Sequence, residues 1–150
     1  MATKKFNEEV YKQELQNTIA AAESHLAELR NLPGPWNYSH IKEVQNTEHE
    51  IMRLQNLMTP KFINEYCYSD RHAYEVIERK SEKVLSIRRL IAKRTDNNGM
   101  SECQTYEFTQ NLEGEVFDVR MHKDGCFYEP KGCNPFILQN EPYEYFDFSF

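Results

Sequence analysis

The segment Ser69–Tyr74 gathers side chains that can bind a small anion in one short connection between two predicted strands. Its chemically useful members are Asp70, Arg71, His72 and Tyr74. A guanidinium can hold a phosphate group through two parallel hydrogen bonds. The alternative is an ordinary polar hairpin turn in which the Asp70 side chain caps the backbone. The spacing alone leaves both interpretations open.

A second polar group occupies the segment Lys93–Ser101, which we expect to form a long loop after a strand. It contains a further guanidinium, two adjacent amides and an apolar thioether, which belong to Arg94, Asn97, Asn98 and Met100. Loops of this kind can wrap a ligand and offer backbone N–H groups to phosphate oxygens. The alternative is a solvated loop that contains a common Asn-Gly turn.

Aromatic side chains could complete a ligand site. Tyr106 and Phe108 lie on one face of a predicted strand, because side chains two residues apart point the same way. Tyr74 could join them, and flat aromatic faces can stack a purine base. More often such a pair belongs to the core. Arg120 adds a cation at the end of another predicted strand, where it could equally be solvated.

The chain contains none of the common catalytic motifs. It has no nucleophile elbow, no phosphate-binding loop, no H-E-x-x-H and no dinucleotide-binding fingerprint. Cys103, His122, Cys126 and Cys133 fit no standard zinc spacing. We therefore expect a binding protein rather than an enzyme, with no cofactor and no bound metal.

Charge and hydropathy restrict the class of partner. The formal net charge is −6, so the chain lacks the broad positive field that binds long nucleic acids. No signal peptide pattern opens the sequence, and no apolar run is long enough to span a membrane. We therefore expect a cytosolic protein with reduced thiols and without membrane contact.

The residues that precede these groups predict a helical hairpin over residues 1–60. One helix is expected over residues 7–31, with Asn7 as its N-cap and apolar residues at steps of three and four. Pro33-Gly34-Pro35 ends it. A second helix is expected from a Ser39 cap to Met58. The apolar stripes are narrow, so the hairpin needs a further surface to cover it, and we expect a homo-oligomer, either a dimer or a larger assembly.

Residues 61–150 predict a β domain that carries the ligand. Fifteen of the 19 aromatic residues lie here, and turn signals separate short runs of strand-forming residues. The expected strands are Phe62–Tyr68, Tyr74–Arg79, Val84–Arg94, Tyr106–Gln110, Val116–His122, Cys126–Glu129 and a piece near Phe136–Leu138. The aromatic end, from Tyr143 to Phe150, is expected to form a last strand. The fold class is therefore α+β, with the hairpin followed by a small, strongly bent antiparallel sheet or barrel.

Four segments of this β half resemble a group of small bacteriophage proteins. They are Tyr68–Tyr74 (YSDRHAY), Ala92–Glu102 (AKRTDNNGMSE), Tyr106–Phe108 (YEF) and Tyr145–Phe150 (YFDFSF). Through them the chain resembles the phage Thoeris anti-defence sponge proteins of the first described type. That family combines N-terminal helices with a β core in an oligomer. Its members sequester a cyclic ADP-ribose isomer, the signal of TIR-based bacterial immunity, without degrading it, and some also hold cyclic oligonucleotides.

The resemblance implies that the two polar segments are walls of one pocket. Arg71 and Arg94 would then hold the pyrophosphate of the ligand. Asn97 and Asn98 would bond its riboses or base edges, and an aromatic ring of the 106–108 strand would stack the adenine. These roles follow from the chemistry of the side chains once the resemblance places them together.

The leading hypothesis is an anti-defence sponge that acts in the host bacterial cytoplasm and binds a small cyclic nucleotide. An alternative is a phage accessory module that docks on a host protein through the helical hairpin. A third is an enzyme that cleaves a nucleotide, with His72 or His122 and a nearby carboxylate as its acid and base.

Overall fold

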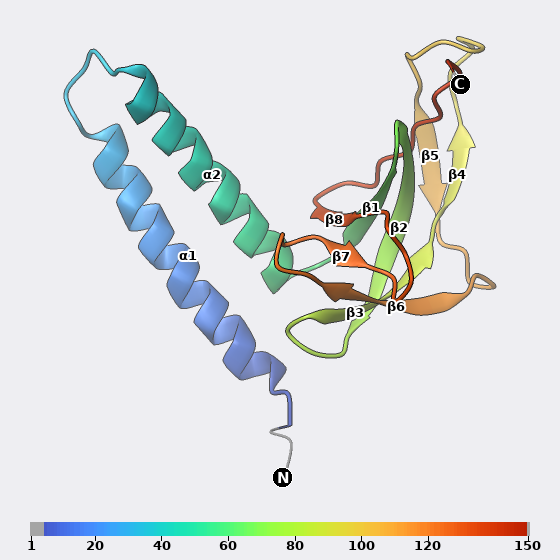
Figure 1. The fold of residues 1–150 in the computed structure, drawn as a ribbon, viewed down its shortest axis with the longest axis horizontal. Helices are drawn as coiled ribbons and strands as arrows, with labels where there is room; N and C mark the ends of the chain where they lie inside the picture. The colour runs from blue at the N-terminus through green and yellow to red at the C-terminus, as the bar shows by residue number, and fades with distance from the viewer. Residues whose placement is uncertain (1–4, 150) are drawn as a thin grey trace. The chain divides into compact units, whose positions relative to one another are not determined.

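The computed structural model describes residues 5–149 of the chain. These residues form two compact units, the first ending at Thr59 and the second beginning at Pro60. The first unit is helical and the second is a β structure (Figure 1). The α+β class expected from the sequence is confirmed.

Two antiparallel helices make up the first unit. Helix α1 spans Glu8–Arg30, and the Asn7 side chain caps it by accepting hydrogen bonds from the N–H groups of Glu9 and Val10, as predicted. Helix α2 spans Tyr38–Met58. Its N-cap is Asn37 rather than the predicted Ser39, because the Asn37 carboxamide accepts the His40 N–H at 2.9 Å and Ser39 already lies in the first turn.

One apolar stripe along each helix is buried. The buried residues are Leu15, Ile19, Leu26 and Leu29 of α1 and Val44, Ile51, Leu54 and Leu57 of α2. Arg30 pairs with Glu48 at 2.6 Å across the hairpin, and His25 approaches Glu43 to 3.3 Å. Because these side chains are exposed, we assign the stability of the hairpin to the apolar stripes rather than to the ion pairs.

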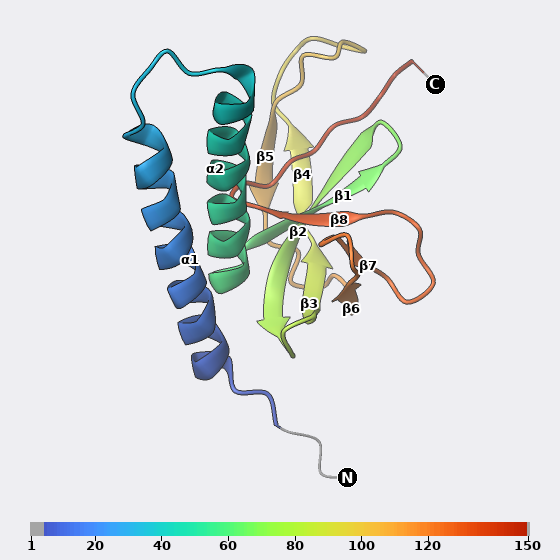
Figure 2. The ribbon, with the colours of Figure 1, turned by 60° about the vertical axis from the view of Figure 1, so that its left-hand side comes forward.

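Eight strands make up the second unit. They are β1 (Phe62–Cys67), β2 (Asp70–Arg79), β3 (Val84–Arg89), β4 (Ile91–Arg94), β5 (Tyr106–Thr109), β6 (Val116–Met121), β7 (Phe127–Tyr128) and β8 (Phe136–Gln139). A closed antiparallel barrel is formed by six of them in the order β1-β2-β3-β6-β7-β8, and β8 pairs with β1 to close it (Figure 2). Strands β4 and β5 form a separate two-stranded sheet.

The barrel core consists of large apolar side chains from several strands. Ile63, Leu85, Ile87, Val119, Phe127 and Phe136 are each at most 1% exposed. The ring of Tyr74 packs edge-on against the rings of Phe136 and Phe117. Gly99 and Gly125, which follow Asn98 and Asp124 in the sequence, both have positive φ, the conformation for which Asn-Gly and Asp-Gly turns select.

Two expectations about the barrel strands need correction. Strand β2 begins at Asp70 rather than Tyr74, so the connection between β1 and β2 consists of only two residues, Tyr68 and Ser69. The run predicted as one strand over Val84–Arg94 is divided at Leu90. The Leu90 side chain is buried and its N–H donates to the Ala73 carbonyl, after which the chain leaves the barrel to pair with β5.

The aromatic end of the chain is not a regular strand. Between residues 141 and 149, which we call the C-terminal segment, the only bridge is the one that joins Tyr145 to Arg71. The reason is geometric, because β3 pairs with β2 only from Tyr74 onward. Only residues 70–73 of β2 lie outside that pairing, and the bridge to Tyr145 lies within them.

Among the described residues, no helix combines the length and the apolar character needed to cross a membrane.

Candidate ligand-binding site

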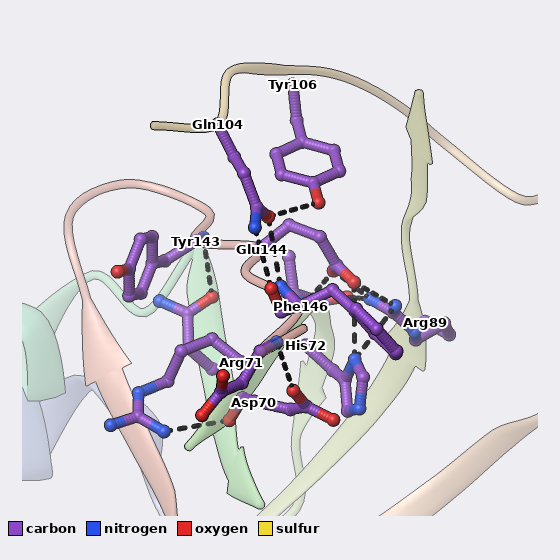
Figure 3. A network of polar contacts seen from close by, with 12 residues as sticks. Asp70, Arg71, His72, Arg89, Gln104, Tyr106, Tyr143, Glu144 and Phe146 are labelled. Carbon is purple, nitrogen blue, oxygen red and sulfur yellow. Dashed lines mark hydrogen bonds and ion pairs between the residues drawn. The ribbon is translucent and has the colours of Figure 1, made fainter. Parts of the chain in front are cut away.

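The C-terminal segment fills the free side of β2 close to the first predicted polar group. The Arg71 N–H donates to the Tyr145 carbonyl at 2.9 Å, and the Tyr145 N–H donates to the Arg71 carbonyl at 3.0 Å. The Asp70 carboxylate accepts the Asp147 N–H at 2.7 Å. Asp70 and Arg71 therefore support the end of the chain through hydrogen bonds (Figure 3).

The second polar loop reaches the same segment through Gln104. The Gln104 amide donates to the Phe146 carbonyl at 2.6 Å and accepts the Phe146 N–H at 3.0 Å. The Tyr106 hydroxyl donates to the same Gln104 oxygen at 2.7 Å. The C-terminal segment is thus hydrogen-bonded to Asp70 and Arg71 of the first predicted group and to Gln104, which follows the second. Of the second predicted group itself, the Arg94 guanidinium carbon lies 5.5 Å from the centre of the Phe148 ring.

Asn64 holds the start of this segment from inside the protein. It is 0% exposed although it is polar. Its amide donates to the Gln139 side chain and to the Glu141 carbonyl, and its oxygen accepts the Tyr143 N–H at 2.9 Å. Because the Asn64 side chain is itself buried, its polar atoms need these partners, and the bonds fix where the segment leaves β8.

A charged network anchors the middle of the segment (Figure 3). The Glu144 carboxylate accepts two hydrogen bonds from Arg89, each at 2.7 Å, and one from the Ala73 N–H at 3.0 Å. The His72 Nδ1 lies 3.2 Å from Glu144 Oε2. Burial alone would raise the pKa of Glu144, but the hydrogen bonds from His72, Arg89 and Ala73 outweigh it and lower this pKa to about 2. Glu144 is therefore an ionised anchor.

Two residues that the sequence predicted for the site, His72 and Tyr74, have raised pKa values here. The hydrogen bond to Glu144 raises the pKa of His72, against the effects of burial and of the nearby Arg89. Burial raises the pKa of Tyr74 to about 12. Since its ring packs among core aromatics, Tyr74 is not placed to stack a ligand, and His72 faces the anchor.

Arg71 is the second residue of β2 and is half-buried, and only part of its guanidinium takes part in hydrogen bonds. Its Nη1 donates to the carbonyls of Tyr68 and Asp70, each at 2.8 Å. The guanidinium carbon lies 4.1 Å from the centre of the Tyr66 ring. Its Nε and Nη2 make no hydrogen bond within the part of the chain that the structure describes. One donor edge of the group is therefore open to an acceptor.

Tyr68 stands at the same turn in an unusual conformation. Its φ is +54°, the left-handed region, and its side chain is 94% exposed. A non-glycine residue in this region is strained, and strain of this kind often marks a functional position. Beside it lies a hollow of about 420 Å³, lined by Cys67, Tyr68, Ser69, Asp70, Phe146 and Asp147. This volume is in the range of small-molecule sites.

The loop after β4 is organised around Asp96. Arg94 donates two hydrogen bonds to its carboxylate, each at 2.9 Å. The N–H groups of Thr105 and Asn98 donate to the same carboxylate. The Arg94 guanidinium, followed by the Thr105 N–H, holds the pKa of Asp96 well below its usual range. Arg94 is therefore occupied within its own loop, in contrast to Arg71.

The remaining predicted site residues do not line the larger hollow. The Asn98 amide donates to the Cys103 carbonyl within the loop, whereas Asn97 is exposed. Met100 borders a smaller hollow of about 200 Å³, which shares Asp147 with the larger one. Phe108 lies 6.4 Å from Tyr106, measured between ring centres. Arg120 is exposed on β6, opposite Val84 and Tyr128, and not beside the C-terminal segment.

Several residues of this region had no clear signal in the sequence. They are Asn64, Tyr68, Arg89, Gln104, Glu144 and Phe146. For Tyr68 and Phe146, the only available signal was their place within two of the segments that carry the resemblance. Arg89 and Glu144 lie 55 positions apart, and no local pattern connects them.

No family model matches this chain, and neither a curated protein nor a solved structure matches it. The likeness to the anti-defence sponge proteins stays a prediction from the sequence.

Proposed function

We propose that the β unit binds and sequesters a small cyclic nucleotide, a cyclic ADP-ribose isomer or a cyclic oligonucleotide, and releases it uncleaved. In this proposal the protein is a phage anti-defence sponge of the host cytoplasm, not an enzyme. The observation that carries it is the β1–β2 turn, where the exposed residue Tyr68 borders a hollow of about 420 Å³. Arg71 does not line this hollow, but it stands next to Asp70, which does, and keeps one donor edge free of hydrogen bonds to the described residues. The sequence resemblance supports the same proposal.

Arg71 is the proposed phosphate ligand. Its guanidinium lies on the Tyr66 ring and is fixed by two backbone carbonyls, so little side-chain freedom remains to be lost on binding. Arg89 and Arg94 already bind carboxylates. A phosphate would have to displace those carboxylates, whereas the Nε–Nη2 edge of Arg71 can accept it directly.

Tyr68 and Phe146 are the proposed contacts for a nucleobase. Both rings line the hollow, and 94% of Tyr68 and 49% of Phe146 are exposed. Stacking on an aromatic ring contributes about 1–3 kcal/mol per base in proteins that bind single strands. This assignment replaces Tyr106 and Phe108, which the sequence suggested for the same role, because neither lines the hollow.

Asp70 and Asp147 are the proposed acceptors for sugar hydroxyls or an exocyclic amine. Both residues line the hollow, and each carboxylate accepts a backbone N–H through its Oδ1, Asp70 from Asp147 and Asp147 from Ser149. Carboxylates bind ribose hydroxyls in the same way in dinucleotide-binding proteins. We therefore orient the ligand with its sugar and base in the hollow and its phosphate toward Arg71.

A sponge needs nanomolar affinity, about −12 kcal/mol. The exposed ring of Tyr68 shows that one chain leaves much of this site open to solvent. We therefore include a homo-oligomer in the proposal, because enclosure by a second chain raises the buried area of the ligand.

The test is a calorimetric titration of the purified full chain with cyclic ADP-ribose isomers and with a panel of cyclic oligonucleotides. The bound ligand is then released by heating and identified by chromatography. Tight binding followed by intact release supports a sponge. Ligand that disappears with time would instead support the enzyme, and no binding across the panel would favour the docking module.

A further inference from the structure

Two of the four cysteines come together where the end of β1 passes the start of β8. The Tyr66 N–H donates to the Pro135 carbonyl at 2.9 Å, which continues the antiparallel pairing of these two strands by one residue. The next pair in this register consists of Cys67 and Asn134. Cys133 directly precedes Asn134 in the chain. The register therefore places one thiol diagonally across from the other.

The side chain of Asn134 contacts both sulfur atoms. Its Nδ2 donates to Cys67 Sγ at 3.4 Å, and its Oδ1 accepts the Cys133 thiol at 3.9 Å. The nitrogen and oxygen of one carboxamide are about 2.3 Å apart. The two sulfurs are therefore at most about 10 Å apart. A single carboxamide lies between two thiols that face the same space.

The spacing of the backbone is compatible with a disulfide. Opposite residues of an antiparallel pair have Cα atoms about 4.5–5.5 Å apart, and consecutive Cα atoms are about 3.8 Å apart. This spacing places the Cα atoms of Cys67 and Cys133 about 6–7 Å apart. Disulfides bridge Cα atoms that are about 4.4–6.8 Å apart. The bond therefore needs the side chains to turn and the Cys133 backbone to adjust slightly.

The Cys133 side of the pair has room for this adjustment. Residues 129–135 connect β7 to β8 and contain no strand. Cys133 is exposed and Asn134 is half-buried, so the carboxamide can turn toward solvent and leave the space between the sulfurs. Cys67 is fixed by comparison, because β1 is paired with β2 on one side and with β8 on the other.

The remaining two cysteines are in a different situation. Cys103 is exposed in the loop between β4 and β5, and Cys126 lies in the connection between β6 and β7. Burial, followed by the charge of Asp124, raises the pKa of the Cys126 thiol, which lowers its share of reactive thiolate. Within the described residues, only the sulfurs of Cys67 and Cys133 contact one common side chain.

We propose that Cys67 and Cys133 form a modification site, a dithiol pair that a small-molecule disulfide such as glutathione disulfide oxidises to a reversible disulfide bond. The exposed Cys133 thiolate attacks one sulfur of glutathione disulfide, which gives a mixed disulfide and releases one glutathione. The Cys67 thiolate then attacks the Cys133 sulfur and releases the second glutathione. The two cysteine protons pass to the two released thiolates. Two protein thiols are thus oxidised while one glutathione disulfide is reduced.

The new bond would lie in the wall of the candidate ligand site. Cys67 lines the hollow of about 420 Å³ at the β1–β2 turn. The bond replaces the hydrogen bond from Asn134 to the Cys67 sulfur and ties the end of β1 to the connection before β8. Where thiols are normally kept reduced, disulfides are usually transient and redox-sensing. The redox state of this pair then sets the shape of one wall, whatever ligand the hollow holds.

The pairing can be read directly because trypsin places each cysteine in a peptide of its own. Cys67 falls in residues 62–71 and Cys133 in residues 132–150. The reduced full chain is incubated with glutathione disulfide, the remaining thiols are alkylated, and the tryptic digest is analysed by mass spectrometry without reduction. We expect these two peptides to be linked in the monomeric chain, with a mass two hydrogen atoms below their sum, and to separate on reduction.

Two variants complete the experiment. Cys103→Ser is the matched control for the loss of one exposed thiol, and its link should form at the rate of wild type. In Cys133→Ser the free Cys67 thiol should disappear at least about tenfold more slowly, because its intramolecular partner is gone. Wild type that gives only glutathione adducts, or that links Cys67 to another cysteine, would overturn the proposal. So would a link found only in covalent dimers, or equal loss of the Cys67 thiol in Cys133→Ser.

Discussion

The side-chain amide of Gln104 forms with the main chain of Phe146 the two hydrogen bonds that a neighbouring strand would otherwise supply, at 2.6 and 3.0 Å. One side chain thus serves as a strand partner for the end of the chain. Asn64, Asp70 and Glu144 add further side-chain contacts to backbone N–H groups. The C-terminal segment is therefore held by specific side chains rather than by a continuous ladder.

Replacing Gln104 should loosen this end of the chain without unfolding the barrel. Gln104→Ala removes both bonds to Phe146, and we expect a loss of about 1–2 kcal/mol in the free energy of unfolding. Hydrogen exchange at the Phe146 amide should become at least tenfold faster. Gln104→Glu is the matched control, since it keeps the acceptor but loses the donor and should give an intermediate rate. Unchanged exchange in Gln104→Ala would show that this pair does not hold the segment.

Asn64 should be the most costly polar residue to replace. Asn64→Ala removes three hydrogen bonds made by a side chain that is 0% exposed, to Gln139, Glu141 and Tyr143. We expect the protein to lose about 2–3 kcal/mol of stability, measured by urea unfolding. The exposed Asn97 offers the control, and Asn97→Ala should change stability by less than about 0.5 kcal/mol. Equal effects of the two substitutions would contradict the anchoring role of Asn64.

The Glu144 network predicts how stability depends on pH. The Glu144 pKa falls from 4.5 to about 2 on folding, so its contribution is present above pH 4.5 and is lost as the pH falls toward 2. The His72 pKa is raised above 6.5 on folding, so its contribution is present below pH 6.5 and is lost as the pH rises through the folded value. The anchor is therefore strongest between about pH 4.5 and 6.5.

Urea unfolding of wild type and of Glu144→Gln at several pH values checks this dependence. The difference between the two proteins should reach on the order of 2–3 kcal/mol near pH 5.5 and shrink at more acidic pH. A difference that is constant from pH 3 to pH 8 would mean that the ionised carboxylate is not the anchor.

Tyr68 allows strain and function to be separated. Tyr68→Gly places the residue that prefers positive φ at a position with φ of +54°, and we expect stability to rise by about 0.5–1 kcal/mol. Ligand affinity should fall at least tenfold because the stacking ring is lost. Tyr143→Gly removes another exposed ring without a positive φ and should not stabilise the protein. Unchanged ligand affinity in Tyr68→Gly would remove Tyr68 from the site.

Local signals in the sequence predicted most of the elements. The Asn7 cap, the apolar stripes and the glycines at 99 and 125 act within a few residues, and the structure agrees with them. The predicted N-cap of α2, Ser39, was wrong by two positions, because Asn37 and Ser39 are both good capping residues. The break at Leu90 could not be predicted, because no turn residue marks it. The strand ends instead where the Leu90 N–H donates to the Ala73 carbonyl.

The candidate site was predictable only in part. The sequence singled out Asp70 and Arg71, and both lie at the turn that carries the proposed site. It gave no reason to separate Arg71 from Arg94, because the bidentate bond to Asp96 depends on how the loop folds. The roles of Gln104, Arg89 and Glu144 arise from contacts between distant parts of the chain.

The measurement that tests the central proposal most directly is a calorimetric titration of cyclic ADP-ribose isomers and cyclic oligonucleotides into wild type and into Arg71→Ala, side by side. Lys131→Ala provides the control for the loss of one positive charge in the same unit. We predict nanomolar binding of one ligand by wild type and by Lys131→Ala, and at least a hundredfold weaker binding by Arg71→Ala, about 3 kcal/mol. Equal affinity of wild type and Arg71→Ala would contradict the placement of the site at the β1–β2 turn, and no binding by wild type would contradict the sponge itself.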